Sequence, residues 1–484
     1  MAHWQLTLSV DRRDARAPLF VRISRAIAAD IRRGRLAPGA ALPGQRALAA
    51  SLGVDRDTVA AAYAELKAQG WIVARPAKGT FVTDTLPDVK PARTARRSRV
   101  RAQEPAFAFE AAALPALTPG PRRPFDLARS VPDVREFPTA EFARAFRRQL
   151  QRRGRALLDY GDARGLPALR SALAAMLVAR RGLAVTAEEL VVVRGSQMAL
   201  ELVARALVRP GDTIAVEEPG YPAAWAAFEA AGARVLALPV DAEGLDVAAL
   251  ERALPAHRVR GVYVTPHHQY PTTVTLAPAR RMALLDLARR HRLAVIEDDY
   301  DHEFHYEGRP ILPLASIDES GSVVYVGTLS KSLAPALRVG YVAAPRPVVE
   351  TLAALRERID RQGDLATEAA IADLLGDGIV QRHVWRMQRL YRARRDVLVD
   401  AVRTRLAGRL ELTVPPGGLA VWARALPGLD VEAWAERCSA RDVVLQPGRR
   451  FTRDRRPVPY VRLNFAALRE GELEEAVRRM AAAV

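Results

Sequence analysis

The fold of this chain is restricted most by an alternation of apolar runs and amphipathic segments in its central part. Six short apolar runs between residues 190 and 328 have the pattern of buried strands, and the segments between them, such as 278–292, have helical spacing. Continuous apolar strands separated by helices predict an α/β fold with a mostly parallel sheet, which binds its ligand at the carboxyl ends of the strands. Because a chain of 484 residues is too long to fold around a single hydrophobic core, we expect two or three domains.

The N-terminal segment has a different pattern, in which helices come first. Apolar residues at four-residue spacing from Leu19 to Ile31 predict an amphipathic helix that ends near Gly34. Residues 45–52 predict a second, short helix, and Gly53 is expected to form the turn after it.

A third helix and a β-hairpin complete this segment. Asp55 is placed to cap a helix over 55–69, and two short β runs lie around Lys78 and Gly79. The buried face of the helix is predicted to carry Val59, Ala62, Tyr63 and Leu66. This order of elements predicts a winged helix–turn–helix, whose third helix presents its first turn to the major groove of DNA.

Positive charge is concentrated in the same part of the chain. Residues 1–82 hold 13 Lys and Arg against 6 Asp and Glu, and residues 83–124 hold 8 against 4, within a net charge of +18. A basic arm favours a nucleic-acid partner, with Arg75 and Lys78 on the hairpin reaching backbone phosphate. The alternative is a small helical docking module whose arginines are solvated.

Residues 84–124 are rich in proline and arginine and poor in apolar residues. They predict a flexible basic linker, because such a segment cannot build a core. The linker arginines add non-specific affinity for phosphate, or the segment serves only as a spacer, and both interpretations stay open.

Lysine is so rare in this chain that one position stands out. The four lysines are Lys67, Lys78, Lys90 and Lys331, among 73 basic residues. An amine can lose its proton and form a Schiff base, whereas a guanidinium cannot. Lys331 lies three residues beyond the apolar run 322–328.

The neighbours of this lysine and the ends of other strands supply complementary groups. Thr328, Ser330 and Arg338 suit a phosphate, and Ser196 and Gln197 open a helix whose free amides favour an anion. In an extended segment Asp298 and Tyr300 share one face, while Asp299 points away. A carboxylate can pair with a pyridine nitrogen, a phenol can bind a ring oxygen, and Tyr221 can stack on a ring. The set predicts a pyridoxal phosphate site.

The N-terminal segment resembles the DNA-binding domain of GntR-type regulators, through LPGQRALAASLGVDRDTVAAAYAELKAQGWIVARPAKGTFV. The resemblance implies that Arg46, Arg56, Thr58 and Gly79 contact DNA. Asp57 stands where the family usually has a small polar residue. It either favours the helix N-terminus or accepts a hydrogen bond from a cytosine amine.

Residues 125–484 resemble fold type I aminotransferases, and the whole chain resembles the MocR-type branch of the GntR regulators. The resemblance rests on motifs that include YGDARGLPALR, EDDYDHEF, YVGTLSKSLAPALRVGY and YVRLNFA. It implies a winged helix–turn–helix domain over 14–83, the linker over 84–124 and a pyridoxal phosphate-binding domain over 125–484. The large subdomain would cover about 185–345.

The same resemblance implies roles for single residues. Lys331 would form the Schiff base with pyridoxal phosphate, and Arg462 would bind the carboxylate of a substrate or effector; the alternative for Arg462 is a surface salt bridge. Tyr160 would reach the phosphate in the neighbouring subunit, which implies a homodimer. The other cofactor-binding residues would be Ser196, Gln197, Tyr221, Asp298, Tyr300, Thr328, Ser330 and Arg338.

Four further positions bear on the ligand. Thr273 stands where relatives usually have glycine, and Ala223 stands where members that sense γ-aminobutyrate carry an arginine, which weighs against that effector. His267 and His268 have no Cys or carboxylate partner at metal spacing, so a hydrogen-bonding role is favoured and no metal site is predicted.

We therefore expect a cytoplasmic, homodimeric, pyridoxal phosphate-dependent transcriptional regulator that senses pyridoxal phosphate or an amino compound. Vitamin B6 synthesis genes are a candidate target by family analogy. The rivals are a working aminotransferase with a DNA-binding appendage and an inert scaffold with a vestigial site. The single cysteine, Cys438, excludes a disulfide scaffold, and no apolar run in the sequence reaches the length of a membrane span.

Overall fold

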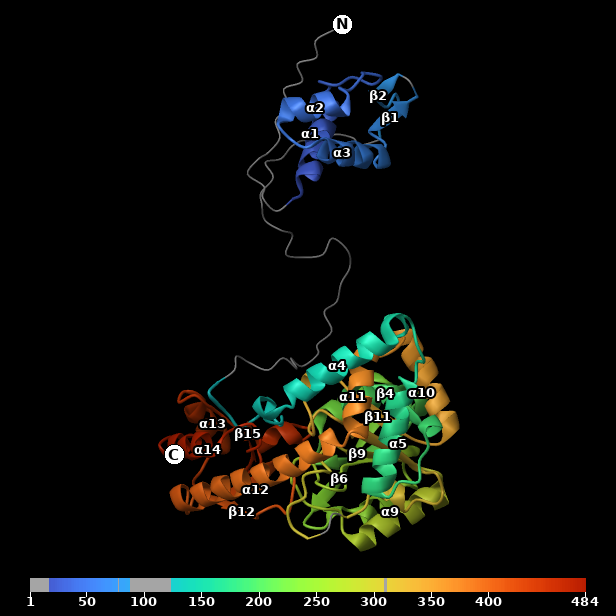
Figure 1. The fold of residues 1–484 in the computed structure, drawn as a ribbon. Helices are drawn as coiled ribbons and strands as arrows, with labels where there is room; N and C mark the ends of the chain where they lie inside the picture. The colour runs from blue at the N-terminus through green and yellow to red at the C-terminus, as the bar shows by residue number, and fades with distance from the viewer. Residues whose placement is uncertain (1–16, 77, 88–122, 309–310) are drawn as a thin grey trace. The chain divides into compact units, whose positions relative to one another are not determined.

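A computed structural model describes residues 17–76, 78–87, 123–308 and 311–484. The chain forms two compact units, Met1–Ala116 and Leu117–Val484, which are treated separately below (Figure 1). Most of the predicted linker, over 84–124, lies outside the described residues, as do residues 14–16 of the predicted first domain. Within the described ranges, no helix is both long enough and apolar enough to cross a membrane.

The first unit has three helices and a two-stranded hairpin, in the order that the sequence predicts. The elements are α1 (Leu19–Arg32), α2 (Gln45–Leu52), α3 (Arg56–Ala68), β1 (Ile72–Arg75) and β2 (Gly79–Val82). Its core consists of apolar side chains from all three helices and the hairpin, among them Ile23, Ile27 and Ile31 of α1. Gly53 ends α2 in the left-handed conformation, with φ 64°, that glycine adopts without steric cost.

Helix α3 presents one apolar and one polar face, as predicted. Val59, Ala62, Tyr63 and Leu66 are its buried residues. The carboxylate of Asp55 caps the helix by accepting a hydrogen bond from the backbone N–H of Asp57, at 3.4 Å. Asp57 therefore lies in the first turn, where a negative charge is stabilised by the helix dipole.

Most of the residues that are predicted to contact DNA are exposed, whereas Thr58 on α3 is half-buried. Arg46 on α2 and Arg56 and Asp57 on α3 are exposed. On the hairpin, antiparallel pairing places Arg75 opposite Gly79. These exposed residues stand on elements that the core holds in place.

Arg75 already has partners on the hairpin. Its guanidinium lies 2.9 Å from the carboxylate of Asp84 and 5.0 Å from the ring centroid of Phe81. Because this ion pair is exposed, it contributes little stability and a phosphate can compete for the arginine.

The second unit is built on an eight-stranded sheet in the order β4-β11-β10-β9-β8-β5-β6-β7. Neighbours from β10 through β6 are parallel, whereas β11 is antiparallel to β10 and β4, and β7 is antiparallel to β6. The prediction of a mostly parallel sheet is confirmed. The strands are β4 (Leu190–Val193), β5 (Thr213–Glu218), β6 (Arg234–Asp241), β7 (Gly244–Leu245), β8 (Val259–Val264), β9 (Ala294–Asp299), β10 (Val323–Thr328) and β11 (Gly340–Ala343).

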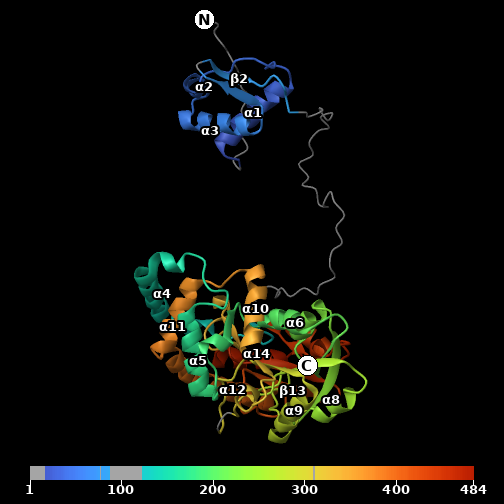
Figure 2. The same cartoon turned by 90° about the vertical axis from the view of Figure 1, so that its right-hand side faces the viewer.

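Helices cover both faces of this sheet (Figure 2). Apolar residues of α6 (Ser196–Leu207), α7 (Pro222–Ala230) and α10 (Arg346–Ile359) pack on one face. The opposite face is covered by two groups of helices, one near β4 and one near β8. These are α5 (Pro167–Arg181) and α11 (Leu365–Gly376), and α8 (Val247–Ala253) and α9 (Pro278–His291).

A smaller subdomain combines the C-terminal residues with the start of this unit. Its four-stranded sheet has the order β12-β13-β16-β15, and the pair β14 and β3 joins residues 443–444 to residues 125–126. The strands are β3 (Phe125–Asp126), β12 (Leu410–Leu412), β13 (Ala420–Ala425), β14 (Val443–Val444), β15 (Gln446–Pro447) and β16 (Tyr460–Asn464). The helices are α12 (Ile379–Arg405), α13 (Val431–Ser439) and α14 (Glu470–Ala481).

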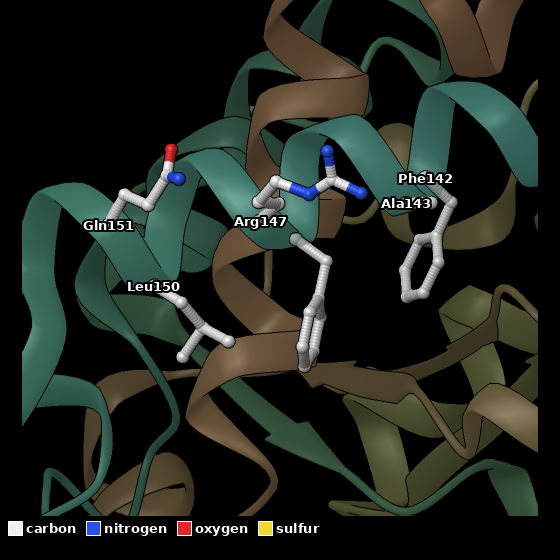
Figure 3. A pocket seen from close by; sticks show the side chains of 6 residues that line it. Phe142, Ala143, Arg147, Leu150 and Gln151 are labelled. Carbon is white, nitrogen blue, oxygen red and sulfur yellow. The ribbon is translucent and has the colours of Figure 1, made fainter.

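Helix α4 (Thr139–Arg153) carries a hollow of about 590 Å³ on its surface (Figure 3). The hollow is lined by Phe142, Ala143, Phe146, Arg147, Leu150 and Gln151. None of these residues belongs to the predicted cofactor site, so this hollow is a feature separate from it.

Candidate functional site

The predicted site residues come from the carboxyl ends of neighbouring strands. Asp298 lies at the end of β9, Thr328 ends β10, and Lys331 follows β10 by three residues. Ser196 and Gln197 begin α6 just after β4. The fold therefore brings groups from distant parts of the chain to one edge of the sheet, as the parallel arrangement predicts.

Lys331 lies in a half-buried position inside this edge. Its amine donates a hydrogen bond to the backbone carbonyl of Ser130, in a segment that the sequence did not point to. Loss of hydration on burial, and then the positive charge of Arg462, lower the pKa of Lys331 to about 8, against the smaller opposing effects of Asp301 and Asp298. The neutral fraction of this amine near neutral pH is therefore larger than that of an ordinary lysine, which makes the amine more nucleophilic.

The lowered pKa of Lys331 predicts a pH dependence for the capture of an aldehyde. Because only the neutral amine reacts, the rate at which cofactor-free protein takes up pyridoxal phosphate should rise about tenfold per pH unit and level off above about pH 8. Stopped-flow absorbance checks this. In Arg462→Met the loss of a like charge should move the midpoint to higher pH. A wild-type rate that still rises steeply above about pH 10 would contradict the assignment.

Asp298 is a buried carboxylate with one unused oxygen. Its Oδ2 accepts a hydrogen bond of 2.8 Å from the hydroxyl of Tyr263 on β8, while Oδ1 has no hydrogen-bond partner among the described residues. Burial raises the pKa of Asp298 to about 7, and the bond from Tyr263 opposes that shift. An orphaned carboxylate oxygen is costly unless a ligand donates to it, and a protonated ring nitrogen would do so.

The neighbouring carboxylate points to the opposite face of the sheet, as the two-residue period of a strand predicts. Asp299 accepts a 2.6 Å hydrogen bond from the hydroxyl of Tyr325 and lies 3.6 Å from the guanidinium of Arg181. Burial raises the pKa of Asp299, but His302 and then Arg181 outweigh it and hold that pKa well below its usual range. Asp299 is thus part of the structural core, and Asp298 faces the site.

The predicted phosphate-binding groups gather between β4, β10 and β11. The hydroxyl of Thr328 lies 3.0 Å from that of Ser330 and also accepts a hydrogen bond from the backbone N–H of Ser330. Arg338 donates a 2.5 Å hydrogen bond to the carbonyl of Arg194. A Cβ atom placed on Gly195 would lie 3.1 Å from both terminal nitrogens of Arg338, so the glycine leaves room for the guanidinium beside the start of α6.

The other residues that are predicted to contact the ring or the phosphate differ in their exposure and in their contacts. Ser196 is half-buried and Gln197 is exposed, and the Gln197 amide donates to the carbonyl of Ala223 at 3.3 Å. Tyr221 is half-buried and lies edge-on to Tyr270, with ring centroids 5.1 Å apart.

Tyr300 is buried, and its hydroxyl donates a 2.9 Å hydrogen bond to the backbone carbonyl of His268. That bond uses the only phenolic proton, so the oxygen of Tyr300 retains its lone pairs for a ligand. The side chain is therefore placed to accept a hydrogen bond rather than to donate a second one.

Arg462, on β16, is a fully buried cation without a counter-charge. It is 0% exposed, and no carboxylate within the described ranges forms a salt bridge with it. Its Nη1 donates to Asn464 at 2.6 Å, Nε has no hydrogen-bond partner there, and the guanidinium lies 4.5 Å from the ring centroid of Tyr270. The alternative of a surface salt bridge is wrong. A buried, unpaired guanidinium is stabilised by a ligand anion.

Two further predicted positions differ from the others: Tyr160 is exposed, and Thr273 has an unusual backbone conformation. Tyr160 is 74% exposed, with the guanidinium of Arg361 at 4.5 Å from its ring centroid. Thr273 adopts φ 66°, the left-handed region that disfavours β-branched residues, and its N–H donates to the carbonyl of Gln269 at 2.7 Å. This backbone conformation explains why glycine suits the position.

The expectation for the adjacent histidines needs correction. Nδ1 of His268 lies 2.8 Å from Oδ1 of Asp301, so a carboxylate partner is present, contrary to the prediction. His267 is buried, and both of its ring nitrogens lack a hydrogen-bond partner in the described part of the chain. The predicted hydrogen-bonding role therefore applies to His268 and is wrong for His267.

Sequence reasoning missed three participants. Tyr263 binds Asp298, Ser130 binds Lys331, and Tyr270 contacts Tyr221, with its ring centroid also 6.0 Å from that of Tyr300. Tyr263 pairs in register with Ile296 on β9 and so shares the face of Asp298, a signal that strand alignment could have provided.

Comparison with known proteins agrees with both halves of this architecture. The family model for aminotransferase class I and II matches residues 125–480, and that for bacterial regulatory proteins of the gntR family matches residues 19–82. The chain is similar to the transcriptional regulator TauR of Rhodobacter capsulatus, at 34% identity over 96% of both chains. It is 33% identical to the probable rhizopine catabolism regulatory protein MocR of Rhizobium meliloti, over 90% of this chain and 87% of that one.

Two further similarities concern pyridoxal compounds. The pyridoxine biosynthesis transcriptional regulator PdxR of Corynebacterium glutamicum is 32% identical over 77% of this chain and 76% of its own length. The α-aminoadipate aminotransferase LysN of Thermus thermophilus, solved with N-(5'-phosphopyridoxyl)-L-leucine, superposes with a TM-score of 0.70 at 29% identity. That similarity covers 74% of this chain and 91% of LysN.

Proposed function

The chain belongs to the aminotransferase class I and II family and carries a gntR-family regulatory domain, and from this premise we propose that it is a pyridoxal phosphate-dependent transcriptional regulator. Its first unit would bind operator DNA and its second unit would bind the cofactor or an amino compound. The observation that carries the proposal is the combination, in one chain, of a helix–turn–helix unit with a half-buried lysine amine at the strand ends.

The residues present fit pyridoxal phosphate. The unused Oδ1 of Asp298 would accept from the ring nitrogen, the Tyr300 oxygen would accept from the ring hydroxyl, and Tyr221 would lie on the ring. The phosphate would be held by groups at the ends of β4 and β10. These are Ser196, Gln197, Thr328, Ser330 and Arg338.

When bound, pyridoxal phosphate supplies an aldehyde that captures amino groups and a ring that withdraws electrons. The chain's own residues would do the rest. Lys331 would provide the amine that holds the aldehyde, and Asp298 would keep the ring nitrogen protonated. Arg462 would orient an incoming amino compound through its carboxylate, because its guanidinium is buried and has no anionic partner in the described part of the chain.

Regulation requires that ligand binding and DNA binding are thermodynamically coupled. The ligand must bind the DNA-competent and DNA-incompetent arrangements of the protein with different affinity, and the coupling is then reciprocal. The similarity to PdxR supports pyridoxal phosphate as the signal and vitamin B6 synthesis genes as the target. The other candidate effectors in this proposal are an amino acid and a taurine-like or other amino compound, any of which could form a Schiff base with the bound cofactor.

A homodimer is part of the proposal. Tyr160 would reach the phosphate in the neighbouring subunit, and its high exposure together with that of Leu158 leaves both side chains available for an interface.

Substitution of the first recognition-helix residue tests DNA binding directly. Arg56→Ala should weaken binding to a duplex selected from a random pool by about 10-fold or more, since a specific base or phosphate contact is worth about 1–3 kcal/mol. Fluorescence anisotropy at fixed salt measures this. Arg144→Ala, an exposed arginine on α4, is the control that should change nothing. Unchanged affinity in Arg56→Ala, or a parallel loss of cofactor absorbance, would contradict the assignment.

A working aminotransferase is the second candidate, favoured by the intact set of Lys331, Asp298 and Arg462. It predicts steady production of keto acid by the purified protein, and Lys331→Ala should abolish that production. The absence of turnover with a panel of amino acids, in protein that carries the cofactor, would leave only the regulatory function.

A further inference from the structure

Four of the eight histidines of the chain lie together beside the cofactor site. His267 and His268 follow β8, and His302 and His305 follow β9. The ring centroid of His267 lies 4.5 Å from those of His268 and His302 and 5.9 Å from that of His305. No step of the proposed function uses these rings.

The ring nitrogens of this cluster lack the partners that buried polar groups require. Both nitrogens of His267, Nε2 of His268 and Nδ1 of His305 have no hydrogen-bond partner within the described ranges. One nitrogen from each of these three rings lies within 4.8 Å of the others. Such a concentration of buried ring nitrogens without partners is costly unless something binds between them.

From this convergence we propose that His267, His268 and His305 bind a divalent transition-metal ion, with Zn²⁺ as the preferred occupant. Neutral imidazole is a strong ligand for Zn²⁺, and three protein ligands with one open position form a recurrent zinc geometry. Tetrahedral Zn–N bonds of about 2.1 Å place ligand nitrogens about 3.4 Å apart, so the rings close from 4.8 Å by side-chain rotation.

The surroundings of the cluster are also those of a metal site. Nδ1 of His268 faces Oδ1 of Asp301 at 2.8 Å, which favours the proton on Nδ1 and leaves the lone pair of Nε2 free for a metal ion. A carboxylate behind a ligating histidine is the usual outer support in zinc sites. Gly417 leaves space there, because a Cβ at that position would lie 2.4 Å from Nε2 of His268.

A route for an ion and a link to the cofactor site are both present. His302 and His305 line a cavity of about 620 Å³, which supplies access. The carbonyl of His268 accepts a hydrogen bond from the hydroxyl of Tyr300, and Gly418 of the small subdomain donates one to the carbonyl of Phe304. Bound metal would therefore join the loops after β8 and β9 next to both the cofactor site and the small subdomain. Zinc would therefore limit the motion of these two loops relative to each other.

Equilibrium dialysis of the metal-stripped full chain against Zn²⁺, with zinc quantified by mass spectrometry, tests the site. We expect one ion per chain, and a Kd raised about 100-fold in His267→Gln and in His305→Gln. Asp301→Asn, which acts through His268, should raise the Kd by about 10-fold. The double variant His257→Gln/His291→Gln removes two exposed histidines outside the cluster and should bind as the parent does.

Thermal unfolding without metal shows whether each variant keeps its fold. His267 is buried, so His267→Gln could lose stability for reasons other than metal binding. In that case the Kd of His305→Gln decides whether the site exists, because His305 is only half-buried. A rise in Kd of tenfold or more that spares the control variant supports the site. A smaller rise, an equal rise in the control, or less than about half an ion per chain at saturation overturns it.

Discussion

Replacing Lys331 by alanine is expected to abolish the visible absorbance of bound pyridoxal phosphate after dialysis. The amine is the only primary amine of the second unit, and its lowered pKa makes it reactive near neutral pH. Without it the cofactor is held by non-covalent contacts alone and should wash out. Absorbance spectra of dialysed wild-type and Lys331→Ala protein, loaded in parallel, give the measurement.

The rarity of lysine makes the control unusually clean. Lys67 is exposed on α3, so Lys67→Ala should retain the full absorbance. Borohydride reduction of loaded wild-type protein fixes the cofactor on the lysine that holds it, and peptide mapping then shows which of the four lysines is modified. Modification at Lys331 alone is the expected result. Retained absorbance in Lys331→Ala, or modification chiefly at another lysine, would refute the assignment of this site.

Arg462→Met is expected to weaken the binding of ligands that carry a carboxylate by about 100-fold. A charge-assisted hydrogen-bonded contact to a buried guanidinium is worth up to about 3 kcal/mol, and each 1.4 kcal/mol corresponds to about tenfold in affinity. The probe is N-(5'-phosphopyridoxyl)-L-leucine, compared with the corresponding adduct that lacks the carboxylate. Calorimetric titration of cofactor-free protein measures both.

Stability separates this role from a structural one. Because Arg462 is buried and no described residue supplies a counter-charge, Arg462→Met should leave the free energy of unfolding of cofactor-free protein unchanged or raise it. Arg424→Met, on the neighbouring strand β13, removes an exposed arginine paired with Glu411 and should not alter binding of either probe. Equal weakening of both probes by Arg462→Met would show that Arg462 does not recognise the carboxylate.

The order and limits of most elements could be predicted from the sequence because local pattern decides them. The run 293–299 became β9, residues 45–52 became α2, and Asp55 caps α3. Each depends on apolar spacing or on a capping side chain within a few residues. By contrast β11 pairs antiparallel inside a sheet of parallel strands, and nothing in its four residues indicates direction.

The candidate site was predictable where chemistry alone selects a residue type. Lys331 stood out as a rare amine, and strand alternation separated Asp298 from Asp299. Contacts between remote segments were not predictable. The position of Arg462 over Tyr270 and the bond from Lys331 to Ser130 depend on how the small subdomain folds back onto the sheet edge. The gathering of His267 and His305 has the same origin, since they follow different strands.

The central claim is that one protein couples a pyridoxal phosphate site to sequence-specific DNA binding. The most direct measurement is capture of genomic fragments by the purified full chain, sequenced with and without added pyridoxal phosphate at moderate salt. We expect recovery of one or a few promoter regions, with an occupancy that the cofactor changes, and the adjoining genes would identify the pathway. Recovery of nothing above background in both conditions would contradict the account and leave an aminotransferase with a basic N-terminal unit.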